Sequence, residues 1–323
     1  LHVWNHGLFK GLLFLGAGSV LHATGTREMS RLGGLWRSMP WTAGLFVLGA
    51  GAISGLPPLN GFVSEWLVFL GLFDAVTLRG SAAWAAVPAA ILLGVTGAMA
   101  LACFVKVCGV VFLGQPRTEA ALHAHECGWR MRVPMLLLSA LCVAIGMGPA
   151  FVWPAISRAA QAWRPEGPMA AGLPLPAALL TLGVWNSALV ALGALAAMAL
   201  WLRVERNGIR RAATWGCAYA APSPRMQYTA GSFAGIITGW FAWALRPRRA
   251  IVPPSGIFPR RASHEVATRE TVLEGIVEPV GRAVMAGAAT LRRLQHGRLQ
   301  AYILYIVVGL AALALLVLPS GTP

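Results

Sequence analysis

Charged side chains are scarce in this sequence. Only 11% of its 323 residues are Asp, Glu, Lys or Arg and 57% are hydrophobic, whereas a soluble domain has about a quarter of its residues charged. The charge is also one-sided, with 11 acidic residues against 26 basic ones. This composition excludes a soluble globular domain and indicates an integral membrane protein. The positive charge lies mainly in loops, so no nucleic-acid partner is expected.

Cysteine frameworks and cofactor motifs are missing. The five cysteines form no CxxC pair and no metal-ligand spacing. His123, His125 and Cys127 are close in sequence, but they lie in a loop without the usual ligand spacing. No Gly-rich dinucleotide loop follows a strand, and no haem-ligand pattern is present. We therefore expect neither cofactor nor metal, and a non-catalytic role.

Lysine is almost absent. Lys10 and Lys106 are the only lysines among the 26 basic residues, and both lie in apolar segments, whereas nearly every arginine lies in a loop, at a span end or in the C-terminal region. Buried lysine shifts its pKa readily, but arginine effectively never loses its proton. Both lysines are therefore candidates for proton transfer. Lys106 is also close enough to the end of its span to reach the headgroups instead.

The longest apolar stretch covers residues 41–73, although a straight span needs only about 20 residues. Its middle contains residues that break helices or bend the chain: Gly55, Pro57, Pro58, Asn60 and Gly61. Because two prolines cannot continue a helix, we predict one half-helix to about Ser54, a non-helical elbow, and a second half-helix from about Asn60. Broken membrane helices of this kind are typical of transporters.

Glu65 lies about one turn into the second half-helix. Desolvation favours its neutral acid, while the positive end of the half-helix favours the carboxylate. A near balance of the two effects suits a group that takes up and releases a proton. The alternative is a carboxylate that only pairs with a structural cation.

His2, His6 and Lys10 recur every four residues in the first apolar segment and share one helix face. Three titratable groups on one stripe of a membrane helix predict the wall of a hydrated proton path. The alternative is a histidine pair at the membrane interface with a lysine that reaches the headgroups.

Apolar segments predict an all-α, polytopic transmembrane helical bundle of about six spans, one of them broken. The spans cover residues 3–23, 41–73, 87–113, 133–153, 175–202 and 299–318. We expect three regions: transmembrane helices in 1–202, an Arg-rich region in 203–298, and a final helix with its tail in 299–323.

The Arg-rich region contains two segments that we expect to lie along the membrane surface. Residues 226–245 are apolar enough to span, but their Gly, Trp and Tyr content also suits an interfacial segment, which we favour. Residues 265–294 alternate apolar residues with arginines and predict a lateral amphipathic helix along a surface, kinked at Pro279.

Arginines are distributed asymmetrically between alternate loops. One side holds three before the broken helix, three around residues 117–132 and fifteen from Arg203 to Arg298, while the other side holds only Arg79, Arg158 and Arg164. The positive-inside rule places the first set in the cytoplasm and the C-terminus outside, in a multi-pass protein of the inner (plasma) membrane.

Two neighbouring stretches, HVWNHGLFKGLLFLGAGSVLHATGTREM and SGLPPLNGFVSEW, closely resemble the paired signature of antiporter-like proton-translocating subunits. That family is shared by respiratory NADH dehydrogenase, multisubunit cation/proton antiporters and membrane-bound [NiFe] hydrogenases. Three further stretches resemble the hydrogenase-4 component B and formate hydrogenlyase branch: FVKVCGVVFLGQPR, TWGCAYAAPSPRMQYTAGSFA and LRRLQHGRLQAYILYI.

The resemblance implies a proton-translocating subunit without its own redox centre, which couples redox chemistry in partner subunits to ion movement. It places Glu65 on the central proton path, with the His2–His6–Lys10 stripe on the preceding helix. It implies other membrane subunits and a [NiFe] hydrogenase arm on the cytoplasmic side as partners. The family's other half-channel would precede Leu1, so we expect this chain to be the C-terminal part of a longer protein.

Two alternatives remain at this point. The first is a subunit of a respiratory NADH dehydrogenase or of a cation/proton antiporter, in which we would not expect the TWGCAYA and RMQYTAGSFA stretches. The second is a membrane anchor that moves no ion, which would need neither Glu65 at a helix break nor the stripe.

Overall fold

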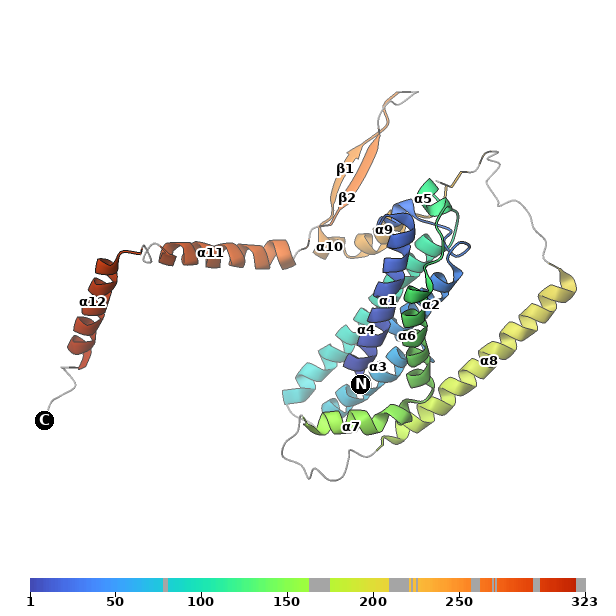
Figure 1. Ribbon diagram of the computed structural model, residues 1–323, viewed down its shortest axis with the longest axis horizontal. Coiled ribbons are helices and arrows are strands. Elements are labelled where there is room, and N and C mark those ends of the chain that lie inside the picture. The colour runs from blue at the N-terminus through green and yellow to red at the C-terminus, as the bar shows by residue number, and fades with distance from the viewer. Residues whose placement is uncertain are drawn as a thin grey trace. The chain divides into compact units, whose positions relative to one another are not determined.

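The computed structural model describes residues 1–77, 81–162, 175–208, 221, 223–224, 226–256, 262–268, 270, 272–292 and 297–317. They form two compact units, Leu1–Ala234 and Gly235–Pro323. Helices dominate both units (Figure 1), which confirms the predicted all-α membrane fold. Arg79 and Arg164, which entered the topology prediction, lie outside the described residues.

The first unit contains the predicted apolar helices. They are α1 (His2–Thr24), α2 (Pro40–Ile53), α3 (Asn60–Thr77), α4 (Ser81–Val107), α6 (Trp129–Met147) and α8 (Ala177–Asn207). Within the described part of the chain, α1, α4 with its π-helical end, α6, α8 and α12 (Leu299–Val317) are each long and apolar enough to cross a membrane. The shorter α2, continued by α3, supplies the broken helix, so the span count agrees with the prediction.

Helix α1 packs against α2 and α6 at the centre of the first unit (Figure 1). Small residues permit this close approach, as is usual between membrane helices. A Cβ atom on Gly16 would meet the Phe46 ring at 2.8 Å, and one on Gly49 would meet the Leu12 side chain at 3.2 Å. Bulkier residues at these two positions would therefore push α1 and α2 apart.

The end of α4 unwinds into a π-helix (Cys108–Phe112) that leads into an extended segment beside the loop after α1. The backbone N–H of Gly34 donates to Leu113 O at 2.8 Å, and that of Trp36 donates to Phe112 O at 2.9 Å. The Arg117 guanidinium donates to the carbonyls of Leu32, Val110 and Tyr228. One side chain therefore joins three segments that are distant in the sequence.

Gln115 and Gln227 form a reciprocal pair. Gln227 Nε2 donates to Gln115 O at 2.9 Å, and the Gln115 backbone N–H donates to Gln227 Oε1 at 3.1 Å. The two residues belong to two of the stretches that resemble the hydrogenase-4 branch, which the structure brings together. This pair and Arg117 fix the chain just before α9 (Ala230–Trp240) to the bundle.

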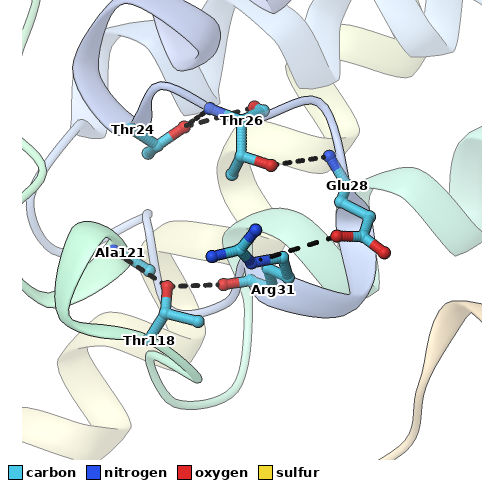
Figure 2. A network of polar contacts seen from close by, with 6 residues as sticks. All are labelled: Thr24, Thr26, Glu28, Arg31, Thr118 and Ala121. Atoms are coloured by element: carbon cyan, nitrogen blue, oxygen red, sulfur yellow. Dashed lines mark hydrogen bonds and ion pairs between the residues drawn. The ribbon is translucent and has the colours of Figure 1, made fainter.

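A polar network closes the loop between α1 and α2 (Figure 2). The Thr118 hydroxyl donates to Arg31 O at 2.8 Å and accepts from the backbone N–H of Ala121, so it caps α5 (Glu119–Leu122). Arg31 also pairs with Glu28 at 3.9 Å. These exposed contacts order the loop but contribute little stability each.

Glu126 holds the start of α2. Its carboxylate accepts from the backbone N–H groups of Trp41 (2.8 Å) and Thr42 (3.3 Å), from the Thr42 hydroxyl and from the Cys127 N–H. Burial alone would raise the pKa of the Glu126 carboxyl, but the hydrogen bonds from Thr42, Cys127 and Trp41 hold it below its usual value. The ionised form is therefore the one that satisfies the free N–H groups of this helix end.

Two predictions about helix boundaries were wrong. The fourth span was expected to cover residues 133–153, but α6 ends at Met147, and α7 (Trp153–Ala162) begins where that span was expected to end. The lateral helix was expected from residue 265, but that position lies in β2 (Ser263–Ala267), which pairs antiparallel with β1 (Arg248–Val252). The helix begins later, with a π-helix (Leu273–Val277) followed by α11 (Glu278–Arg292). Pro279 is the second residue of α11, which continues directly from the π-helix, and the kink expected there stays a prediction.

Residues 226–245 form two short helices, α9 and α10 (Ala242–Leu245), with a break at Phe241. Helix α9 has 11 residues, and a rise of about 1.5 Å per residue makes it too short to cross the hydrocarbon. The interfacial interpretation of this segment is therefore consistent with the structure.

Candidate functional site

The predicted elbow is present between α2 and α3. Helix α2 ends at Ile53 and α3 begins at Asn60, with turns and bends between them. Gly55 adopts a left-handed conformation with φ 62°, and the Pro57–Pro58 peptide bond is cis. The prolines therefore interrupt the helix where the sequence predicted.

Both ends of the elbow, at Ser54 and Asn60, are buried in protein, whereas Leu56 and Pro57 in its middle are exposed. A Cβ atom on Gly61 would collide with the carbonyl oxygen of Ala52, so the two half-helices approach each other closely at their ends. A Cβ atom on Gly146 of α6 would collide with the carbonyl oxygen of Pro58, so α6 covers the elbow directly. This burial is the condition under which non-helical backbone exists at membrane depth.

Glu65 lies over the elbow. Its side chain is half-buried, and a Cβ atom on Gly55 would collide with Glu65 Oε2. Within the described residues, no hydrogen bond or ion pair involves this carboxylate, so the structural-cation alternative gains no support from the residues around it. The carboxylate therefore lies beside the helix break, as the sequence predicted, and its role in proton transfer stays a prediction.

The stripe on α1 reaches α3 through His2. His2 Nδ1 lies 3.0 Å from the hydroxyl of Ser64, the residue before Glu65. The ring centroids of His2 and His6 are 6.1 Å apart, and His6 packs edge-on against Phe9 at 5.4 Å. His2 therefore contacts the start of α3, which carries Glu65, whereas His6 is exposed and contacts His2 and Phe9 of its own helix.

Neither lysine contacts Glu65 among the described residues. Lys10 lies one turn beyond His6 and is half-buried, and no direct contact with Glu65 is found among the described residues. Lys106 lies at the end of α4, where Val107 and Phe104 pack on a cluster that includes Leu32 and Phe112. That cluster belongs to the loop end of α1, whereas the elbow packs on Phe9.

Asn5 is a site residue that sequence reasoning missed. It is fully buried, and its Nδ2 donates to Asn60 O at 2.8 Å, which joins α1 to the first residue of α3. Ser64 is also buried and donates to Gly61 O at 3.0 Å. An isolated asparagine in an apolar helix was the only available signal for Asn5, since polar residues in spans are functional candidates.

Across the residues that the structure describes, no three His, Cys, Asp or Glu side chains are placed to hold a metal ion.

Fold and site together are those of a helical membrane protein with a broken helix. Residues 1–94 match the family described as NADH:quinone oxidoreductase/Mrp antiporter, TM. The resemblance inferred from the sequence motifs is thereby confirmed, and the chain is a multi-pass membrane protein.

Two curated relatives extend the similarity beyond that segment. The chain is 35% identical to hydrogenase-4 component B of Escherichia coli (strain K12) over 97% of its own length and 48% of the relative. It is 34% identical to formate hydrogenlyase subunit 3 of the same organism, over 79% of this chain and 41% of the relative. The chain thus spans about half the length of the curated relatives that it matches.

A solved structure has a similar fold. It is that of the membrane-bound sulfane sulfur reductase, an archaeal respiratory membrane complex, with a TM-score of 0.62 and 20% identity. The match covers 96% of this chain and 46% of the other. It supports the helical membrane fold along nearly the whole chain.

Proposed function

We propose that this chain is part of a proton-translocating membrane subunit of a hydrogenase-4 or formate-hydrogenlyase type complex. The observation that carries the proposal is the half-buried Glu65 carboxylate over Gly55 at the helix break. A membrane anchor has no use for such a group. Redox chemistry would occur in partner subunits, and this chain would move ions in response.

The proposed proton path uses the groups that meet at the elbow. His2 and His6 form its α1 side, and Ser64 connects His2 to α3. Glu65 takes up a proton and releases it on the other side of the break, and Lys10 biases that exchange by its charge, since charges interact more strongly in the protein interior than in water. Lys106, at the other end of the bundle, belongs to a separate section of the path.

The branch of the family is supported by the extent of the similarity. The relative named hydrogenase-4 component B matches 97% of the chain, whereas the general family model matches only residues 1–94. The Gln115–Gln227 pair adds a structural reason, because it joins two of the stretches that resemble this branch. We therefore propose a [NiFe] hydrogenase arm on the cytoplasmic side as a partner.

Affinity purification of the full-length protein from its native membrane tests this assignment. We expect a [NiFe] hydrogenase large subunit and other membrane subunits to co-purify, and to be identified by mass spectrometry. Recovery of NADH-oxidising subunits instead, or of antiporter subunits alone, would move the chain to another branch of the family.

The topology can be tested with an impermeant thiol probe on intact cells. Cys127 is a poor reporter because its side chain is only 3% exposed, and Cys217 lies outside the described residues. His125 in the same loop is exposed, so we expect His125→Cys to be labelled only after the membrane is permeabilised. Labelling in intact cells would reverse the proposed orientation of the Arg-rich loops and of the C-terminus.

A further inference from the structure

The hairpin of β1 and β2, drawn as two arrows in Figure 1, forms a sheet of two strands only. The strands pair antiparallel at five positions, from Arg248 with Ala267 to Val252 with Ser263. Every side chain described in the two strands is exposed. A two-stranded hairpin is at best marginally stable in water and needs a further surface to pack on. We therefore expect one face of this hairpin to be covered by a partner.

The register divides the hairpin side chains between two faces. Successive residues of a strand point to opposite faces, and directly paired residues share a face. Arg249 pairs with Val266, and Ile251 lies two residues further along β1, so these three side chains share the first face. The second face holds Arg248, Ala250, Val252, Ser263, Glu265 and Ala267. The acidic residue of the two strands therefore lies on the second face.

The first face combines a cation with exposed apolar side chains. Ile251 is 58% exposed and Val266 is 48% exposed, and Arg249 is exposed on the same face. The guanidinium group of arginine presents a planar fork of donors that matches a phosphate group. Apolar side chains beside such a cation fit the boundary between lipid headgroups and acyl chains. The first face therefore has the chemistry of a phospholipid-binding surface.

The charge of the surrounding sequence favours an anionic lipid. Residues 246–261 contain five arginines and no acidic residue. Clusters of about four to eight Lys or Arg beside a membrane segment typically bind anionic headgroups. An acidic surface of a partner protein would also attract this charge, so a second observation is needed to choose between the two.

The segment just before the hairpin supplies that observation. Helix α10 ends at Leu245, and β1 begins at Arg248, only three residues later. Trp240 and Trp243 in this segment are 73% and 78% exposed, and tryptophan is enriched at the interface between membrane and water. The hairpin therefore starts close to the headgroups, which favours lipid as its partner.

We propose that the hairpin binds anionic phospholipid headgroups with the face that holds Arg249, Ile251 and Val266. Arg249 pairs with a headgroup phosphate, and the two apolar side chains lie against the upper part of the acyl chains. The second face points to water, because the phosphates would repel the Glu265 carboxylate. This surface does not depend on proton translocation by the chain.

Fluorescence quenching of the complete complex in lipid nanodiscs tests the proposal. A genetically encoded dansyl amino acid replaces either Ile251 or Val252, which are neighbours on opposite faces and are both exposed. The discs contain phosphatidylglycerol and phosphatidylcholine, and some lipids carry a doxyl quencher near the headgroup. We expect strong quenching of the label at position 251 and weak quenching at position 252.

Two arginine variants provide a matched comparison with the label at position 251. Arg249→Gln should shift the hairpin about fivefold towards the free form, since one arginine near an anionic surface contributes roughly that factor. Arg248→Gln removes the same charge from the opposite face, about 10 Å away, which is close to the Debye length at physiological ionic strength. We expect a much smaller change in quenching from this variant.

Four results would overturn the proposal. Weak quenching at both positions would show that the hairpin does not lie on lipid. A blue-shifted but unquenched label at position 251 would show that a protein covers this face instead. Equal quenching at position 251 in discs of phosphatidylcholine alone would exclude a role for anionic headgroups. Equal effects of Arg249→Gln and Arg248→Gln would overturn the assignment to this face.

Discussion

Replacement of Glu65 by Gln should depress proton translocation by a factor on the order of 100, the usual contribution of a positioned proton-transfer group. Glutamine preserves the size and hydrogen bonding of the side chain but cannot ionise. The carboxylate lies at the break and no partner for it is found among the described residues, so assembly should survive. Proton uptake into vesicles that contain the complete complex measures the effect.

Two comparisons make this result specific. Glu119→Gln changes an exposed carboxylate, whose side chain is 86% exposed, and should leave translocation unchanged. Lys10→Ala should lower translocation as Glu65→Gln does, since both groups belong to the proposed path. Hydrogen-evolving activity with an artificial donor should persist in all three variants, because the proposed function places the redox centres in other subunits. Unmodified translocation by assembled Glu65→Gln complexes would leave the membrane-anchor alternative in place.

Gly61→Ala should prevent stable folding of the elbow. A Cβ atom at this position would collide with the Ala52 carbonyl oxygen, which is backbone and cannot rotate away. Separation of the half-helix ends would also disturb the hydrogen bond between Asn5 and Asn60 O. We expect the free energy of unfolding to fall by about 4 kcal/mol, a loss typical of substitutions that disrupt a core. Thermal denaturation in detergent, followed by size-exclusion chromatography, measures it.

Gly71→Ala supplies the matched control in the same helix. A Cβ atom at Gly71 would meet no atom within 4 Å. Alanine favours helix over glycine by about 0.5–1 kcal/mol, so the variant should be as stable as the parent or slightly more so. Equal losses in the two variants would show that α3 does not tolerate alanine generally, and that the close approach of the half-helices is not the cause.

The sequence predicted the helix break because its signals are local. Two adjacent prolines between glycines interrupt a helix wherever they occur, and Glu65 follows at a fixed interval along the second half-helix. The periodicity of His2, His6 and Lys10 places them on one face of any helix that contains them. Such inferences need only the geometry of a single element.

The remaining features depend on contacts between distant segments. Gln115 and Gln227 are 112 residues apart, and nothing in either stretch predicts that they pair. Asn5 gains its role only because Asn60 O lies 2.8 Å away. The lysines share a chemical type that suits proton transfer, but tertiary packing places the end of α4, which carries Lys106, against the loop end of α1 rather than at the elbow. The hairpin of β1 and β2 was also missed, since its arginines are typical of a polar loop.

Helix α8 is much longer than the hydrocarbon layer is thick. Its 31 residues rise by about 1.5 Å each, which exceeds the roughly 30 Å of a bilayer core. It runs obliquely to α6 in Figure 1, and an oblique course fits a long apolar helix into a thinner layer. Asn186 of α8 donates to Gly146 O at 2.7 Å, and Gly146 in turn lies against Pro58 of the elbow. Because a change in bilayer thickness changes the tilt of a long helix, we expect the thickness of the surrounding lipid to affect the backbone beside Glu65 through Asn186 and Gly146.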